Sequence, residues 1–272
     1  MLRDRDHYPR RHFVSADEPT REEVATRWLK MAPGIEAMTE RIADPRDFPV
    51  EPGSPLFGDD KASDPYLVSL AARACLMIGV DHLDAAKSLV LDLKVLHISA
   101  AYTLVRGALE NLAAAFWILN PSQRNDRIEH TLRWHAKDLR EQGIAMKSRG
   151  MLDDSDYHSK LARLHAVAAP RDIPNQIVDA GFRSSTAIKY ASGEFPDYEV
   201  LLSWQVCSGF AHGRPWAVLA LSERELYETA VPGVMGVRVV SNPGRLTGAA
   251  TCAFNLLVAV VDVLQQRSLA PA

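Results

Sequence analysis

The sequence predicts a mainly α-helical bundle with a small β-hairpin before the C-terminal helix. Apolar residues recur at helical spacing along most of the 272 residues, and 47% of the chain is hydrophobic against 24% charged, a balance typical of globular proteins. Two β-like runs, 216–221 and 234–240, flank a loop that contains Pro232 and Gly233. We therefore expect a single helical domain over 20–272, with a hairpin at 216–240 packed on the helices.

The N-terminal part of the sequence predicts an arm, a helix and a long loop. Residues 1–19 carry many charges and no sustained apolar period, so we expect a flexible arm outside the core. Thr20 is a helix N-cap residue followed by acidic residues, which predicts a helix to residue 42 with a break near Pro33. The stretch 44–64 contains four prolines, and we expect a surface loop that serves as a linker or a lid.

The middle of the sequence predicts two apolar helices followed by two charged ones. Asp64 and Pro65 match an N-cap and a first helical residue, which predicts a helix that reaches Lys94 with an interruption near Gly79. The charge-poor stretch 95–123 predicts a second apolar helix, ended by its Asn-Pro pair. Outer amphipathic helices are expected over 122–149 and 153–168.

The last third of the sequence predicts two short helices, the hairpin and a long final helix. The short helices are expected over 176–182 and 196–211, and Gly213 with Pro215 marks the end of the second one. The final helix, 243–266, is rich in alanine, leucine and valine, so we expect it to be a second central element of the bundle.

Net charge, cysteine spacing and the N-terminal sequence indicate the cellular compartment of the protein. The net charge of -3 combines 31 basic with 34 acidic residues, so no overall field draws the chain to nucleic acid. Cys75, Cys207 and Cys252 form no CxxC pattern, and the N-terminus lacks the apolar run of a signal peptide. We expect a reduced cytoplasmic protein. The apolar segments 95–119 and 246–264 contain polar or charged residues, so bundle helices are favoured over membrane spans.

Arg106 and Glu110 are the most informative residues of the sequence. They are the only Asp, Glu, Lys or Arg residues in 95–123, and they are four positions apart, so they share one helix face with Gly107. Charged groups in an apolar helix are paired or functional. Two interpretations stay open: a guanidinium that binds a phosphate or carboxylate, or a buried ion pair that fixes helix register. Asn111, about 100 degrees further round the helix, is expected to make a separate contact.

His212 is the second candidate binding residue. It lies in the run S-G-F-A-H-G-R-P-W at the expected end of a helix, before Gly213. The negative end of the helix dipole favours a protonated histidine, which suits a proton donor or an anion contact. The alternative is a histidine that only caps the last carbonyls. Convergence of His212 with Arg106 in space favours the functional interpretation for both.

Arg124, Asn125 and His130 form the third candidate, in the run R-N-D-R-I-E-H, where an arginine followed by a polar residue precedes a histidine by six positions. This run resembles the motif of the HEPN superfamily, helical proteins of toxin-antitoxin, abortive-infection and RNA-processing systems. The resemblance covers at most 65–170 and the last helix. It implies a metal-independent ribonuclease in which Arg124 and His130, from two subunits, flank an RNA phosphate at a dimer interface. An ordinary solvated helix face is the alternative.

Several other chemistries lack their sequence patterns. The chain has no GxGxxG, GxxxxGK[ST], HExxH or GxSxG motif, so dinucleotide, P-loop, zincin and serine-hydrolase functions are not indicated. His130 and His135 are five positions apart and therefore point to different faces of a helix, which does not suit a zinc site. We expect neither a metal nor a cofactor.

Two functional hypotheses follow. The first is a homodimeric, HEPN-like protein that acts on RNA in a defence or toxin system, with Arg124 and His130 as the catalytic pair. The second is a non-catalytic helical module that binds a protein partner or a small anion. In that case Arg106, Glu110, Asn111 and His212 are the candidate binding residues, together with the proline-rich loop.

Overall fold

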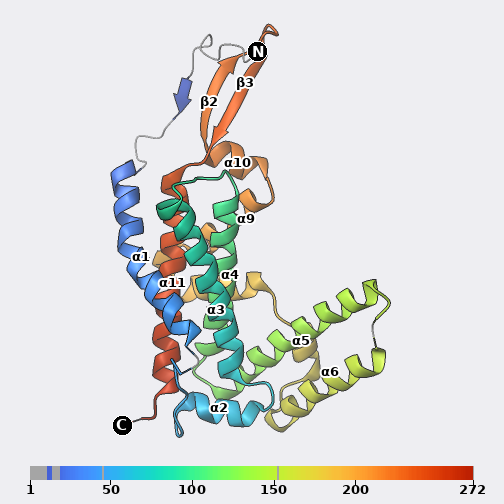
Figure 1. Ribbon diagram of the computed structural model, residues 1–272. Helices are drawn as coiled ribbons and strands as arrows, with labels where there is room; N and C mark the ends of the chain where they lie inside the picture. Colours follow the sequence, from blue (N-terminus) through green and yellow to red (C-terminus); the bar gives the residue numbers. More distant parts are fainter. Residues whose placement is uncertain (1–10, 14–18, 45, 152, 272) are drawn as a thin grey trace.

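The computed structural model describes residues 11–13, 19–44, 46–151 and 153–271. Figure 1 shows long helices side by side in a bundle, a helical pair that reaches to one side and a β-hairpin at one end. The predicted fold class is confirmed. The helices are α1 (Arg21–Ala43), α2 (Pro55–Ser63), α3 (Val68–Lys87), α4 (Ala100–Leu119), α5 (Arg124–Ser148), α6 (Asp154–Ala168), α7 (Asn175–Ala180), α8 (Ser184–Glu194), α9 (Val200–Ala211), α10 (Pro215–Leu221) and α11 (Pro243–Ser268). The strands are β1 (Arg11–Phe13), β2 (Glu223–Glu228) and β3 (Met235–Val240).

Helix α4 is the centre of the bundle. It packs against α3, α5, α8, α9 and α11, and its alanine, leucine and aromatic side chains are almost all buried. A helix enclosed on most sides is apolar on most sides, which explains the low charge of this segment. The predicted central helix is therefore confirmed, although α4 begins only at Ala100, after an exposed linker over 93–99.

Helix α1 begins where the sequence predicts. The Thr20 hydroxyl accepts a hydrogen bond from the Glu23 amide, while the Glu23 carboxylate accepts one from the Thr20 amide, so the two residues cap each other. The break expected near Pro33 is wrong, because α1 runs through this proline to Ala43. Buried Met31 and Ile35 hold the helix to the core on both sides of Pro33. This packing offsets the hydrogen bond that the proline removes.

The stretch 44–64 is not a continuous loop. Helix α2 occupies its second half, and Ser54 caps that helix by accepting a hydrogen bond from the Phe57 amide at 3.1 Å. Pro55 is the first helical residue, a position at which proline has no intrahelical bond to lose. The interpretation of residues 55–63 as part of a linker or lid is therefore wrong.

Asp64 ends α2 and does not begin α3, which starts at Val68. Helix α3 continues without interruption through Gly79, where a Cβ atom would lie 2.7 Å from Leu112 Cγ on α4. The glycine thus serves close helix packing and does not break the helix. Helix α3 stops at Lys87, and a π-helix, η1 (Ser88–Asp92), replaces the expected last turns.

The stretch 216–221 is helix α10, so the expected first strand of the hairpin is wrong. A short apolar run carries no decisive period, and Pro215 supplies the first helical residue instead. The hairpin lies directly afterwards, where β2 pairs antiparallel with β3. Strand β1 pairs antiparallel with the other edge of β2 and was not predicted. The remainder of the expected arm, 1–10 and 14–18, lies outside the described residues.

The remaining helices follow the predictions with shifted ends. Helices α5, α6, α7, α9 and α11 match predicted segments, whereas α8 was not predicted. Figure 1 shows the hairpin extending beyond the end of the bundle, so the expectation that it packs on the helices is wrong. Val234, Met235 and Val237 on the hairpin are about half exposed accordingly.

Helix α11 is long and apolar enough to cross a membrane by length and composition alone. Its most apolar window has a mean hydropathy of 1.8, and half of that window is buried in the structure. The bent pair formed by α2 with α3 and η1 passes the same test. Core helices of bundles have this composition too.

Candidate functional site

Arg106 and Glu110 lie on the flank of α4 that faces α9. The Arg106 Nε atom donates to Glu110 Oε1 at 2.9 Å, and Trp204 Nε1 on α9 donates to the same oxygen at 2.7 Å. The two side chains are 25% and 23% exposed, so the expected burial of this pair is only partial. The carboxylate thus holds the guanidinium through Nε and leaves Nη1 available for another partner.

His212 contacts Arg106, so the two candidate binding residues converge in space. Arg106 Nη1 lies 3.0 Å from His212 Nε2. A guanidinium only donates hydrogen bonds, so Nε2 is the acceptor and the imidazole is neutral in this contact, with its proton on Nδ1. The protonated form expected from the helix dipole therefore does not fit this contact. His212 is the C-cap residue of α9, and Gly213 follows with a φ of 60° in the left-handed region.

Two aromatic contacts fix α9 against α4 around this pair. Tyr102 stacks on Phe210 with ring centroids 3.9 Å apart, and Trp204 binds Glu110 about two helical turns further along. Residue numbers rise along α4 as they fall along α9, so the two helices are antiparallel at this contact. Arg106 lies between these two anchors, which restrict its position.

Asn111 does not belong to this cluster, in agreement with its expected separate contact. Its Nδ2 donates to the Gly107 carbonyl of its own helix at 2.9 Å. Gly107 itself lies under a histidine, because a Cβ atom there would be 2.6 Å from the ring of His82. The α4 backbone next to Arg106 is therefore closely covered by α3.

A shallow open hollow adjoins the Arg106 contact on the outer side of α9. Trp204, Ser208 and His212 line it from successive turns of α9, and Arg214 and Trp216 line it from the turn and helix that follow. Trp216 is 52% exposed. In the part of the chain that the structure describes, the Arg214 guanidinium has no hydrogen-bond or ion-pair partner. The hollow therefore combines cationic and aromatic groups that are open to a ligand.

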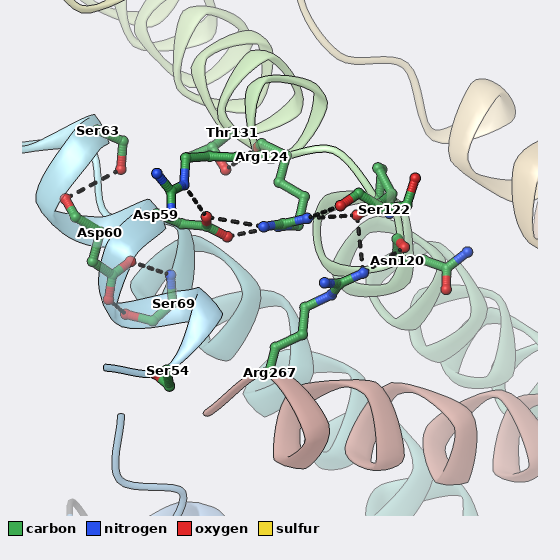
Figure 2. Close-up of polar contacts among 12 residues, drawn as sticks. Ser54, Asp59, Asp60, Ser63, Ser69, Asn120, Ser122, Arg124, Thr131 and Arg267 are labelled. Atoms are coloured by element: carbon green, nitrogen blue, oxygen red, sulfur yellow. Dashed lines mark hydrogen bonds and ion pairs between the residues drawn. The ribbon is translucent and has the colours of Figure 1, made fainter. Parts of the chain in front are cut away.

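Figure 2 shows a second polar cluster around Asp59 of α2, which is fully buried. Arg127 of α5 binds both carboxylate oxygens of Asp59, with Nε to Oδ2 at 2.6 Å and Nη2 to Oδ1 at 2.9 Å. Its Nη1 donates to the carbonyl groups of Pro121 and Ser122. Arg267 of α11 also donates to the Pro121 carbonyl, so one cluster joins α2, the start of α5 and the end of α11.

Arg124, one of the two expected catalytic residues, belongs to this cluster. Its Nε donates to Asp59 Oδ1 at 3.1 Å, and its side chain is 55% exposed. Arg124 packs closely on Gly58, where a Cβ atom would lie 2.6 Å from its Nη2. The known contacts of Arg124 are therefore those of an ion pair at the edge of a structural cluster.

His130, the other expected catalytic residue, is largely buried on α5. Its ring stacks on Trp117 with centroids 3.7 Å apart, and Nδ1 donates to the Trp117 carbonyl at 2.6 Å. Burial lowers the pKa of His130 from 6.5 to about 4, although the bond to Trp117 works in the opposite direction. His130 is therefore neutral at pH 7. Within the described residues, Arg124 contacts Asp59 of α2 whereas His130 contacts Trp117 of α4, and the two side chains make no contact with each other.

Sequence reasoning did not identify Asp59, Trp204 or Arg214. Asp59 lies in a stretch that was interpreted as a loop, so no sequence pattern indicated that it is buried. Trp204 precedes His212 by eight residues, which is close to two helical turns and places both on one face of α9. Arg214 stood in the quoted run around His212. Among the described residues, no group of three His, Cys, Asp or Glu side chains is placed to hold a metal ion.

The Asp59 cluster predicts unequal costs for its two arginines. Replacing Arg127 by glutamine should lower the free energy of unfolding by about 3–5 kcal/mol, because it leaves a buried carboxylate without its bidentate partner. Arg124→Gln should cost about 1 kcal/mol or less, since that side chain is half exposed. Urea unfolding monitored by circular dichroism measures both values. Equal costs would show that Asp59 does not depend on Arg127.

His130 predicts a loss of stability in acid. Since its pKa is lower in the folded chain, the unfolded chain binds more protons between pH 6.5 and about 4. The contribution of neutral His130 to the free energy of unfolding is complete above pH 6.5. It is lost as the pH falls toward 4, by up to about 1.4 kcal/mol per pH unit. Urea unfolding from pH 7 to 4.5 should therefore show a weaker pH dependence for His130→Asn than for the wild type. His158→Asn, at an exposed position of α6, should leave the dependence unchanged. If the free energy of unfolding depends on pH equally in His130→Asn and in the wild type, the lowered pKa of His130 is contradicted.

Comparisons with known proteins leave the site to be interpreted from its geometry. No protein family, no curated protein and no solved structure matches this chain.

Proposed function

We propose that this protein is a non-catalytic helical module that binds a small anion, a phosphate or a carboxylate, in the hollow beside Arg106. The contact between Arg106 and His212 carries the proposal. Arg106 Nη1 has a neutral imidazole nitrogen as its partner at 3.0 Å, at the edge of an open hollow. An anionic oxygen is a stronger acceptor for a guanidinium than that nitrogen, so an incoming anion competes well for the same donor.

The surroundings of Arg106 support anion binding. Glu110, the carboxylate in contact with Arg106, accepts from both Arg106 and Trp204 through one oxygen. These bonds hold the carboxylate at Nε, whereas Nη1 contacts His212. The guanidinium is thereby oriented before a ligand arrives, which reduces the entropy lost on binding. Arg214 lines the hollow itself, and Arg106 contacts the lining residue His212, so two cations border the hollow.

RNA cleavage by a homodimer with Arg124 and His130 at its interface stays a second proposal, based on the resemblance to HEPN proteins. One observation is compatible with it. His130 is neutral and uses Nδ1 for Trp117, so Nε2 keeps a lone pair that can accept a proton. The exposed part of Arg124 could in turn contact a phosphate. This proposal needs a second subunit to bring the two residues together.

Anion binding predicts a thermal shift that depends on Arg106. Phosphate or acetate at one hundred times its dissociation constant should stabilise the wild type by about 2.7 kcal/mol. Arg106→Gln should lose most of this stabilisation, because glutamine offers no charged fork. Arg149→Gln, at an exposed arginine at the end of α5, is the matched control and should respond like the wild type. Equal shifts for all three proteins would remove Arg106 from the site, and no shift for any of them would refute the proposal.

The two proposals differ in a direct assay. A single-stranded RNA incubated with the protein and a metal chelator should remain intact if the protein only binds anions. Metal-independent cleavage that disappears in His130→Asn, with the fold retained by circular dichroism, would instead establish the ribonuclease. Asparagine can still donate to the Trp117 carbonyl, so this variant removes the titrating ring with little loss of structure. Cleavage that persists in His130→Asn would point to a contaminating nuclease.

A further inference from the structure

The hollow beside Arg106 has an aromatic side as well as a cationic one. Trp216 of α10 is 52% exposed, whereas Trp28 and Trp117 elsewhere in the bundle are 0% and 3% exposed. Trp204 also lines the hollow, and its indole nitrogen is bound to Glu110 at 2.7 Å, so its ring has a fixed direction. An aromatic ring left open at a cationic hollow offers a stacking surface to a ligand.

Gly209 is what allows Trp216 to occupy this place. A Cβ atom at Gly209 would lie 2.5 Å from the Ala217 Cβ and 2.8 Å from the Trp216 Cζ2. Both distances are shorter than carbon atoms tolerate, so only glycine lets α10 close on α9 here. One part of the Trp216 ring is thus held against the α9 backbone, while about half of the side chain stays open.

Arg214 lines the same hollow as this ring, and Arg106 contacts its lining residue His212. Trp204, Ser208 and His212 line the hollow over about 12 Å of α9, at 1.5 Å per residue. Arg106 meets the hollow through its contact with His212, and Arg214 lies two residues before Trp216. A flat ring that carries an anionic group can contact both the cations and the aromatic side of the hollow, whereas a bare inorganic anion would leave the ring of Trp216 unused.

We propose that the ligand is a small aromatic anion, a flat ring that carries a phosphate or a carboxylate. Its ring stacks on Trp216, and its anionic group binds Arg106 and Arg214. The inference rests on the proposed anion site and specifies what that site selects. Stacking on an open tryptophan is worth up to about tenfold in affinity, so the aromatic part should be visible in a direct comparison of ligands.

Matched pairs of ligands test the inference by isothermal titration calorimetry. Phenyl phosphate is compared with methyl phosphate, and benzoate with acetate, so that each pair differs in the ring alone. The wild type should bind the aromatic member about tenfold more tightly. The better of the two aromatic ligands identifies the anionic group. Equal affinity within both pairs would overturn the inference and leave the proposed anion site intact, whereas absence of binding by all four would refute both.

Variants locate the two parts of the ligand. Trp216→Leu should lose the preference for the ring and keep its affinity for methyl phosphate or acetate, while Trp216→Phe should keep part of the preference. Arg106→Gln should weaken binding of every anion. Leu219→Ala, at an exposed position of the same short helix, is the control and should bind like the wild type. An unchanged ring preference in Trp216→Leu, in a protein that remains folded by circular dichroism, would overturn the inference.

Discussion

The structure depends on the enclosure of α4. A helix with apolar residues on nearly every face is stable in water only when other helices surround it, and α3, α5, α8, α9 and α11 do so here. Arg106 and Glu110 are the exception, and they lie where α9 meets α4. The polar bonds made by Trp204 and His212 at this place satisfy groups that packing alone would leave without partners. The candidate site is thus a direct result of how a central helix accommodates its only charges.

A second constraint acts at the opposite end of the bundle, near the C-terminus (Figure 1). Asp59 is fully buried and has no water to solvate its charge, so the bidentate bond of Arg127 is the condition for its burial. The same arginine and Arg267 both reach the Pro121 carbonyl, which fixes the turn between α4 and α5. This geometry also determines the surroundings of Arg124, because Asp59, to which Arg124 binds, is already held by the bidentate bond to Arg127.

Periodicity and capping chemistry predicted the bundle because they act locally. The Thr20 cap, the apolar stretch of α4 and the charged face of α5 needed no knowledge of distant residues. The errors occurred where tertiary packing overrides a local signal. Pro33 remains inside a helix, and the apolar run after Pro215 folds as a helix because it packs on Gly209. The sequence already suggested a contact between Arg106 and His212. It did not suggest that Trp204 binds Glu110, because this contact depends on the antiparallel packing of α4 against α9.

The lining of the hollow comes from one continuous stretch of chain, whereas its guanidinium beside Glu110 comes from α4. Substitutions have different structural consequences in these two parts. Most side chains of α4 are buried, so changes to its apolar residues disturb the core of the whole bundle. The side chains of Gln205, Arg214 and Trp216 are exposed, and they can be exchanged while the helices stay in place. The chemistry of the hollow can therefore be altered within a single short segment, 204–216, without rebuilding the bundle.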